Sequence, residues 1–209
     1  RTLLMLTSNL KIKYGNLWER VVTHPFIKEM GDATLSKEVF RRYFVQDYAV
    51  VGDIVATVAY GIAKAPDLDG AEILNRFMQG ILNPEKEIFH DTFRDFHATR
   101  EELADKKPIT EAFGDFLVRI GLEGTFADIA TVLYVTEGTY MDWAGRLINA
   151  GKKPQVQAYQ AWIDIHGPDV LGDVVQYLGR YLDERVTLYS MCFNNNDNSF
   201  NGVYVYKKQ

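Results

Sequence analysis

The spacing of apolar residues constrains the fold of this 209-residue chain more than any other feature of its sequence. Apolar residues recur every three or four positions in nearly every long segment. No segment before the C-terminal tail keeps the two-residue alternation of a strand. The sequence therefore predicts an all-α fold. The expected helices cover Leu10–Thr23, Ser36–Lys64, Gly70–Thr99, Thr110–Gly121, Thr125–Ala150, Pro154–His166 and Asp169–Tyr189.

Proline and serine residues indicate where these helices begin and end. The residue before Pro25 is pushed out of the α region, so the first helix should end there. Ser36 suits an N-cap, and Pro154 suits the first position of a helix. Pro84 lies inside the third expected helix, which it should kink or split.

The chain shows no internal repeat and no linker, which predicts a single helical domain over residues 1–209. The tail, residues 190–209, is atypical. Asn194–Ser199 is poor helix material, and Val203–Tyr206 has the local pattern of a strand.

Charge and cysteine content exclude several classes of function. The net charge of −5 gives no electrostatic basis for binding nucleic acid or an anionic membrane. No apolar run approaches the length of a membrane span. The single cysteine, Cys192, cannot form an internal disulfide, so a reducing cytoplasmic setting is expected.

Two carboxylates lie where helical periodicity calls for apolar residues. Asp47 lies in the middle of an apolar stripe on the second expected helix, and Glu137 is embedded in the stripe of the fifth, one turn before Tyr140. A buried carboxylate must be paired, protonated or bound to a ligand. For Asp47, a salt bridge to Arg41, to Arg42 or to a residue on a distant helix is the structural alternative.

Glu85 and His166 are weaker candidates for the same site. Glu85 lies between Ile81 and Phe89 on a third stripe, but the kink at Pro84 could turn it inward or outward. His166 follows Trp162 by four residues, and such a histidine is more often a core residue with one hydrogen bond than a catalyst.

Carboxylates that share a site raise one another's pKa, so one residue type can supply both an acid and a base. Four nearby rings could sandwich a flat heterocycle beside them: Tyr43, Phe44, Phe113 and Tyr140. The alternative, in which each carboxylate pairs with its own arginine or lysine, stays open.

Motifs for other chemistries are absent from the sequence. There is no glycine-rich phosphate loop and no GxSxG elbow. Glu87 and His90 form one E-x-x-H, whereas di-iron bundles use that motif twice. We therefore interpret Glu87 and His90 as a surface pair and expect no metal site.

Two long segments resemble a known family. The sequence HPFIKEMGDATL at His24–Leu35, followed by FRRYFVQDY at Phe40–Tyr48, closely resembles the N-terminal signature of the TenA/thiaminase II family. Phe126–Ile129 and Tyr159–Ile163 match further family motifs, and the similarity runs from Leu17 to Leu182.

The resemblance implies a heme-oxygenase-like helical bundle that forms a homotetramer. It implies hydrolysis at the aminomethyl carbon of a 4-amino-2-methylpyrimidine, in thiamine degradation or salvage, without a cofactor. The family aspartate that holds the amino and ring-nitrogen edge of the pyrimidine falls on Asp47, which can pair with an amidine-like edge through two hydrogen bonds.

The sequence departs from the family at several site positions. The nucleophilic cysteine of familiar members falls at Thr136, beside Glu137, and a usual tyrosine falls at Val50. The stacking aromatic falls at Phe113, and another usual tyrosine falls at His166. Only Asp197, with Phe200, has the spacing of the C-terminal acid of the site. The chain thus resembles the cysteine-free branch, which is associated with aminopyrimidine salvage.

Three functional hypotheses follow. The first is a cysteine-free hydrolase in which Glu137 activates water and Asp47 holds the substrate and acts as acid/base partner, with Phe113, Tyr140 and Tyr43 as the ring clamp. The second is an aminopyrimidine-binding protein without turnover. The third is a metal-dependent oxidase on the same scaffold.

Overall fold

The computed structural model describes residues 5–189 and 204–207, and this part of the chain confirms the all-α class. Helices make up nearly all of it, followed by two short strands. The elements are α1 (Leu6–Val22), α2 (Pro25–Gly31), α3 (Lys37–Lys64), α4 (Leu68–Gly80), the π-helical turn η1 (Ile81–Glu85), α5 (Lys86–Asp95), α6 (Arg100–Ala104), α7 (Pro108–Glu123), α8 (Phe126–Asn149), α9 (Gln157–Ile165), α10 (Pro168–Arg185), β1 (Val186–Tyr189) and β2 (Tyr204–Lys207).

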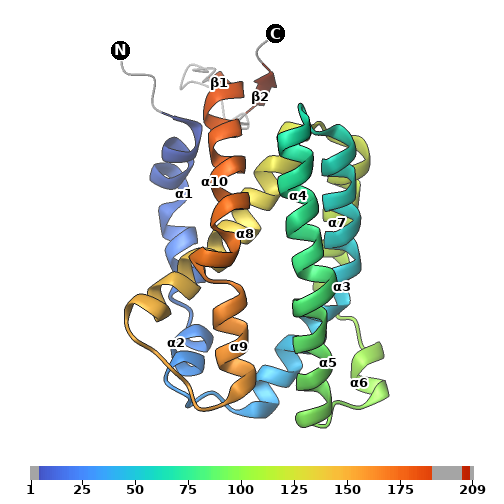
Figure 1. The fold of residues 1–209 in the computed structure, drawn as a ribbon, viewed down its shortest axis with the longest axis vertical. Helices are drawn as coiled ribbons and strands as arrows, with labels where there is room; N and C mark the ends of the chain where they lie inside the picture. Colours follow the sequence, from blue (N-terminus) through green and yellow to red (C-terminus); the bar gives the residue numbers. More distant parts are fainter. Residues whose placement is uncertain (1–4, 190–203, 208–209) are drawn as a thin grey trace, which may run out of the picture.

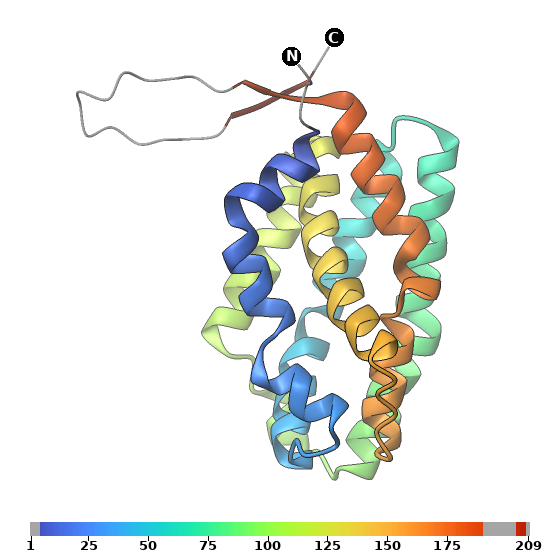
Figure 2. The same cartoon turned by 90° about the vertical axis from the view of Figure 1, so that its left-hand side faces the viewer.

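The long helices run along the length of the molecule in two packed groups (Figure 1). Helix α3 packs against α7 and α4, and α8 packs against α10 and α1. The short helices α2, α6 and α9 lie toward one end, and the strand pair extends from the other end (Figure 2). Among the described helices, none is both long and apolar enough to span a membrane.

Local chemistry explains where the helices begin. The Ser36 hydroxyl accepts a hydrogen bond from the Val39 amide (3.2 Å), which confirms the predicted N-cap of α3. Thr125 and Asp128 form a reciprocal capping box at the start of α8. Prolines occupy the first turn of α2, α7 and α10, where no amide donor is needed.

The third expected helix, Gly70–Thr99, is split as Pro84 predicted. Pro84 has no N–H to donate, and the helix widens into the π-turn η1 before α5 continues. The predicted end at Thr99 is wrong, because α5 ends at Asp95 and His97 has a positive φ of 54°. The short helices α2 and α6 were not predicted.

The last expected helix is too long by four residues. Helix α10 ends at Arg185, and Val186–Tyr189 forms a strand antiparallel to Tyr204–Lys207, with Val186 opposite Lys207. Residues 186–189 are mostly β-branched or aromatic, which favours the strand once a partner is present. A strand was expected at Val203–Tyr206, and β2 lies one residue further along the chain.

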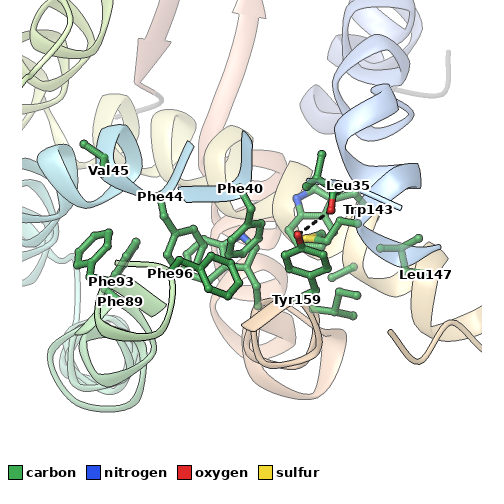
Figure 3. Packing of buried hydrophobic residues seen from close by; sticks show 14 of the residues in the cluster. Leu35, Phe40, Phe44, Val45, Phe89, Phe93, Phe96, Trp143, Leu147 and Tyr159 are labelled. Atoms are coloured by element: carbon green, nitrogen blue, oxygen red, sulfur yellow. Dashed lines mark hydrogen bonds between the residues drawn. The ribbon is translucent and has the colours of Figure 1, made fainter. Parts of the chain in front are cut away.

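The core consists of two clusters, and the boundary between them positions the site. The first is aromatic and gathers Phe40, Phe44, Phe89 and Tyr159 between α3, α5 and α9 (Figure 3). The second is mainly aliphatic and joins α4, α8 and α10. Tyr140 packs against both clusters, so its surroundings on α8 lie where they meet.

Candidate active site

A cavity of about 270 Å³ lies where α3, the α4–η1 segment, α7 and α8 converge. Its volume is near the lower end for ligand pockets, as a single small ring would need. The lining is a mostly apolar wall with a group of polar side chains. It comprises Val21, Asp47, Val50, Ile54, Phe77, Ile81, Glu85, Phe113, Val135, Thr136, Glu137, Thr139, Tyr140 and His166.

Asp47 faces this cavity from α3 and is held by tyrosine hydroxyls. Tyr140 donates a hydrogen bond to Asp47 Oδ1 (3.1 Å), and the hydroxyl oxygens of Tyr140 and Tyr43 lie 2.7 Å apart. Burial raises the pKa of Asp47 to about 7, although hydrogen bonds from the two tyrosines oppose the rise.

The alternative salt bridge from Asp47 to Arg41 or Arg42 is wrong. Arg41 pairs with Glu102 at 2.8 Å, and Arg42 lies 3.9 Å from Glu38. Both arginines therefore compensate carboxylates that lie outside the cavity.

Glu137 faces the same cavity from α8 and is 8% exposed. Its Oε1 accepts a hydrogen bond from the hydroxyl of Thr136 (2.9 Å). Burial raises the pKa of Glu137 to about 7, and the charge of Asp47 adds to the rise while Thr136 opposes it.

Glu85 completes the acidic group from η1. Glu85 follows Ile81 by four residues, and both line the cavity, so the turn at Pro84 directs Glu85 inward. Burial, followed by the charges of Asp47 and Glu137, raises the pKa of Glu85 well above its ordinary value. No hydrogen bond or ion pair joins Glu85 to any residue that the structure describes.

The three carboxylates thus share one cavity without a basic partner among residues 5–185, whose side chains the structure describes. No lysine or arginine lines the cavity. The ion pairs formed within residues 5–185 involve carboxylates other than these three. The alternative in which each carboxylate pairs with its own cation is therefore wrong for this part of the chain. Groups with a pKa near neutrality can hold or release a proton at physiological pH, as acid/base catalysis requires.

His166 caps α9, is buried, and lines the cavity. Its Nδ1 lies 2.8 Å from the carbonyl oxygen of Trp162. Because a carbonyl only accepts, we assign the proton to Nδ1, which leaves Nε2 as an acceptor. Burial lowers the pKa of His166 to about 4, so the ring is neutral and cannot compensate the carboxylates.

The four expected clamp rings occupy different positions. Phe113 lines the cavity from α7 and is 40% exposed, and Tyr140 lines it from α8. Tyr43 adjoins the cavity through the hydroxyl of Tyr140.

The expectation that Phe44 faces the ligand is wrong. Phe44 is fully buried in the aromatic cluster beside Phe89 (Figure 3). Its ring centroid lies 4.6 Å from that of Trp162 and 4.8 Å from that of Phe89. The apolar stripe of α3 is wider than the cavity, and this part of it packs against α5 and α9 instead.

Several residues that line the cavity were not predicted from the sequence. Phe77 precedes Ile81 by four residues, and Ile81 precedes Glu85 by four, so helical spacing could have found this face. Thr139 is also buried and lines the cavity. Its hydroxyl donates to the carbonyl of Thr136 (2.8 Å), which lets a threonine occupy a buried helix position.

Other acidic and histidine residues lie apart from the cavity. Asp142 accepts hydrogen bonds from Trp18 Nε1 and Arg146 Nε, both at 2.7 Å. Glu87 and His90 are exposed, and within the described residues no group of His, Cys, Asp and Glu could hold a metal ion. Asp197 and Phe200 lie outside the described residues.

Comparisons with known proteins identify the family of the chain. The model of the TENA/THI-4/PQQC family matches residues 12–191. An aminopyrimidine aminohydrolase of Halalkalibacterium halodurans is 24% identical over 179 residues, which cover 85% of this chain and 80% of that protein. One from Helicobacter pylori is 25% identical over 150 residues, covering 71% of this chain and 69% of that protein.

Solved structures show the same fold. A TenA homologue from Pyrococcus furiosus superposes with a TM-score of 0.74 at 24% identity, covering 85% of this chain and 84% of that one. A TenA homologue from P. horikoshii gives 0.74 at 20% identity, covering 86% and 85%. The chain has the heme-oxygenase-like helical fold, and it belongs to the TENA/THI-4/PQQC family.

Proposed function

We propose that this protein is a cofactor-independent hydrolase of thiamine salvage, which cleaves the aminomethyl C–N bond of a 4-amino-2-methylpyrimidine. The observation that carries the proposal is the group of three carboxylates on the wall of one small, largely apolar cavity, with no basic partner among the side chains that the structure describes. Relatives that cover most of the chain are named aminopyrimidine aminohydrolases.

In this proposal Asp47 and Glu137 divide the chemistry. Asp47 binds the amino and ring-nitrogen edge of the pyrimidine, exchanging a proton with the ring nitrogen. Glu137 takes a proton from water, whose oxygen forms a bond to the methylene carbon. The electron pair of the C–N bond leaves with the nitrogen of the protonated aminomethyl arm, which already carries three hydrogens and so departs as neutral ammonia.

The remaining residues of the cavity position these groups. Phe113 and Tyr140 hold the flat ring, and Tyr43 fixes the hydroxyl of Tyr140. Thr136 orients the carboxylate of Glu137. His166 offers Nε2 as an acceptor for a donor on the substrate.

The test is turnover of 4-amino-5-aminomethyl-2-methylpyrimidine, followed as released ammonia and as the hydroxymethyl product. We expect activity in the wild type and its loss in Glu137→Gln and Asp47→Asn. Saturable binding without product in the wild type would favour the alternative, an aminopyrimidine-binding protein. If the wild type shows no binding and no turnover of this compound, the assignment of the cavity is overturned.

We propose further, from the resemblance, that the chain is a single domain that assembles as a homotetramer in the cytoplasm. Light scattering coupled to gel filtration measures the assembly directly. A monomer at micromolar concentration would contradict it.

A further inference from the structure

We propose that Glu85 selects substrates with a primary ammonium on the arm at position 5 of the pyrimidine, by pairing its carboxylate with that cation. The inference rests on the proposed function and adds a specificity-determining residue to it. Glu85 differs from the other two carboxylates in how it is held, and that difference carries the argument.

The α4–η1 segment presents Glu85 to the cavity at the end of a regular row. Phe77, Ile81 and Glu85 are spaced by four residues and all line the cavity. The first two provide an apolar wall, and the third provides a charge at the end of it. Pro84 is exposed, and Glu85, the last residue of the π-turn, has a helical backbone (φ −67°, ψ −44°).

The other two carboxylates already have donors within the protein. Asp47 accepts a hydrogen bond from Tyr140, and Glu137 accepts one from Thr136. Glu85 has no hydrogen bond or ion pair with any described residue. Its carboxylate is therefore the one whose whole bonding capacity is available to a ligand.

The rest of the cavity cannot balance this charge. The remaining lining is apolar or neutral, and His166 is uncharged. The charges of Asp47 and Glu137 act on Glu85 with the same sign. A ligand with a positive charge and hydrogen-bond donors would stabilise the negative charge of Glu85 in this cavity. A primary ammonium has the positive charge and three N–H donors.

An ammonium at this position also suits the reaction. The C–N bond breaks with its electron pair on nitrogen, so a nitrogen that already carries three hydrogens leaves as neutral ammonia. Glu85 keeps the arm protonated without transferring a proton itself. The water proton goes to Glu137, and the charges balance before and after the step.

The pairing implies that substrate and product are held unequally. The 5-aminomethyl substrate is a cation, whereas the 5-hydroxymethyl product is neutral. Loss of the cation on hydrolysis removes the partner of Glu85, which favours release of the product.

The test compares these two ligands in Glu85→Gln, with Glu87→Gln as the matched control because Glu87 is exposed two residues further on. We expect kcat/KM for the aminomethylpyrimidine to fall about 30-fold or more in Glu85→Gln, as for loss of one partner of a buried charge pair. The dissociation constant of the hydroxymethylpyrimidine, measured by calorimetry, should change less than about threefold. Glu87→Gln should behave as the wild type.

Glu85→Asp provides the second variant, since it keeps the charge on a shorter side chain and should restore part of the discrimination. Equal weakening of both ligands, or an unchanged kcat/KM in Glu85→Gln, would overturn the role of Glu85. Those results leave the proposed function intact, because the wild type still turns over the substrate. A wild type that neither binds nor hydrolyses the aminomethylpyrimidine would overturn both.

Discussion

The hydroxyl of Tyr140 on α8 lies 3.1 Å from Oδ1 of Asp47 on α3, and this hydrogen bond joins the two helices beside the cavity. It also limits how far burial raises the pKa of Asp47, because a donor favours the charged form of a carboxylate. The contact therefore affects both the geometry and the protonation of the group proposed to hold the pyrimidine.

Tyr140→Phe should weaken ligand binding most strongly near neutral pH. Without the donor, the pKa of Asp47 rises further above about 7, and less of the group is ionised at pH 7. We expect the dissociation constant of the hydroxymethylpyrimidine to rise about fivefold at pH 7 and less at pH 8.5, since a rise of about one pKa unit lowers the ionised fraction at pH 7 from about one half to about one tenth. Calorimetry over this pH range measures it. Tyr48→Phe, whose hydroxyl faces His90 instead, should show no such change.

Asp47→Asn should stabilise the empty protein at alkaline pH. The pKa of Asp47 is raised from 3.8 to about 7 by folding, so the folded state holds a proton that the unfolded state has lost. Its contribution to stability falls as pH rises from about 4 to about 7 and stays low above that. We expect a gain of about 1–3 kcal/mol at pH 8 and almost none at pH 4, below the full linkage value because the cavity admits solvent.

Chemical denaturation of wild type and Asp47→Asn at both pH values tests this prediction. A loss of about 3–5 kcal/mol at pH 8 would instead identify Asp47 as half of a structural ion pair. The expected gain, together with loss of ligand-induced stabilisation, would separate a ligand-binding group from a structural one.

The sequence was sufficient to predict that Asp47 and Glu137 face one cavity. Each is a carboxylate on an apolar helix face, and such a position is costly without a partner or ligand. The direction of Glu85 could not be predicted in the same way. It depends on how the helix accommodates Pro84, and a π-turn, a break and a kink would each rotate the following residues differently.

The error at Phe44 has a related cause. Periodicity shows which residues point away from solvent, but it does not distinguish a cavity from a packed core. Phe44 and Asp47 lie on one stripe, yet one meets Trp162 and Phe89 while the other meets the cavity. Likewise, the strand at Val186–Tyr189 requires a partner that lies 15 or more residues further along the chain.

Phe44→Ala should therefore affect mainly stability, whereas Phe113→Ala should affect mainly substrate binding. Phe44 is fully buried, so its truncation should cost about 3–5 kcal/mol of stability. Phe113 is partly exposed at the cavity, so its truncation should change stability little and raise KM roughly five- to tenfold through loss of ring stacking. Thermal unfolding and initial rates on the two variants test the pair. If Phe44→Ala instead has normal stability and a much higher KM, Phe44 contacts the substrate and the prediction is wrong.

Thiamine should be a poor substrate. Thr136 occupies the position that the resemblance gives to a nucleophilic cysteine, and a threonine hydroxyl ionises far less readily than a thiol near neutral pH. Thiazole release from thiamine, compared with ammonia release from the aminomethylpyrimidine, measures the preference. Efficient thiamine cleavage abolished by Thr136→Ala would show that the threonine is the nucleophile. Loss of activity only in Cys192→Ala would place the nucleophile in the tail.

The rate of hydrolysis should rise with pH through a value near 7. Glu137 acts as a base only when ionised, and burial together with the charge of Asp47 raises its pKa to about 7. A plot of kcat/KM against pH should therefore have its rising limb near 7, well above the range of an exposed glutamate. A rising limb near pH 4 to 5 would contradict the role of Glu137, because it would report an acid that burial does not perturb.

Thr136→Val identifies the group that produces this limb. The valine keeps the shape of the side chain but removes the hydroxyl that bonds Glu137 Oε1 and opposes the rise in its pKa. The limb should move to higher pH, so that activity is lost at pH 6.5 and approaches the wild-type value at pH 8.5. Thr131→Val is the control, since the Thr131 hydroxyl bonds only the carbonyl of Ala127 one turn earlier on the same helix. A limb that moves equally in both variants would assign the titration to a general change in α8, whereas a shift confined to Thr136→Val assigns it to Glu137.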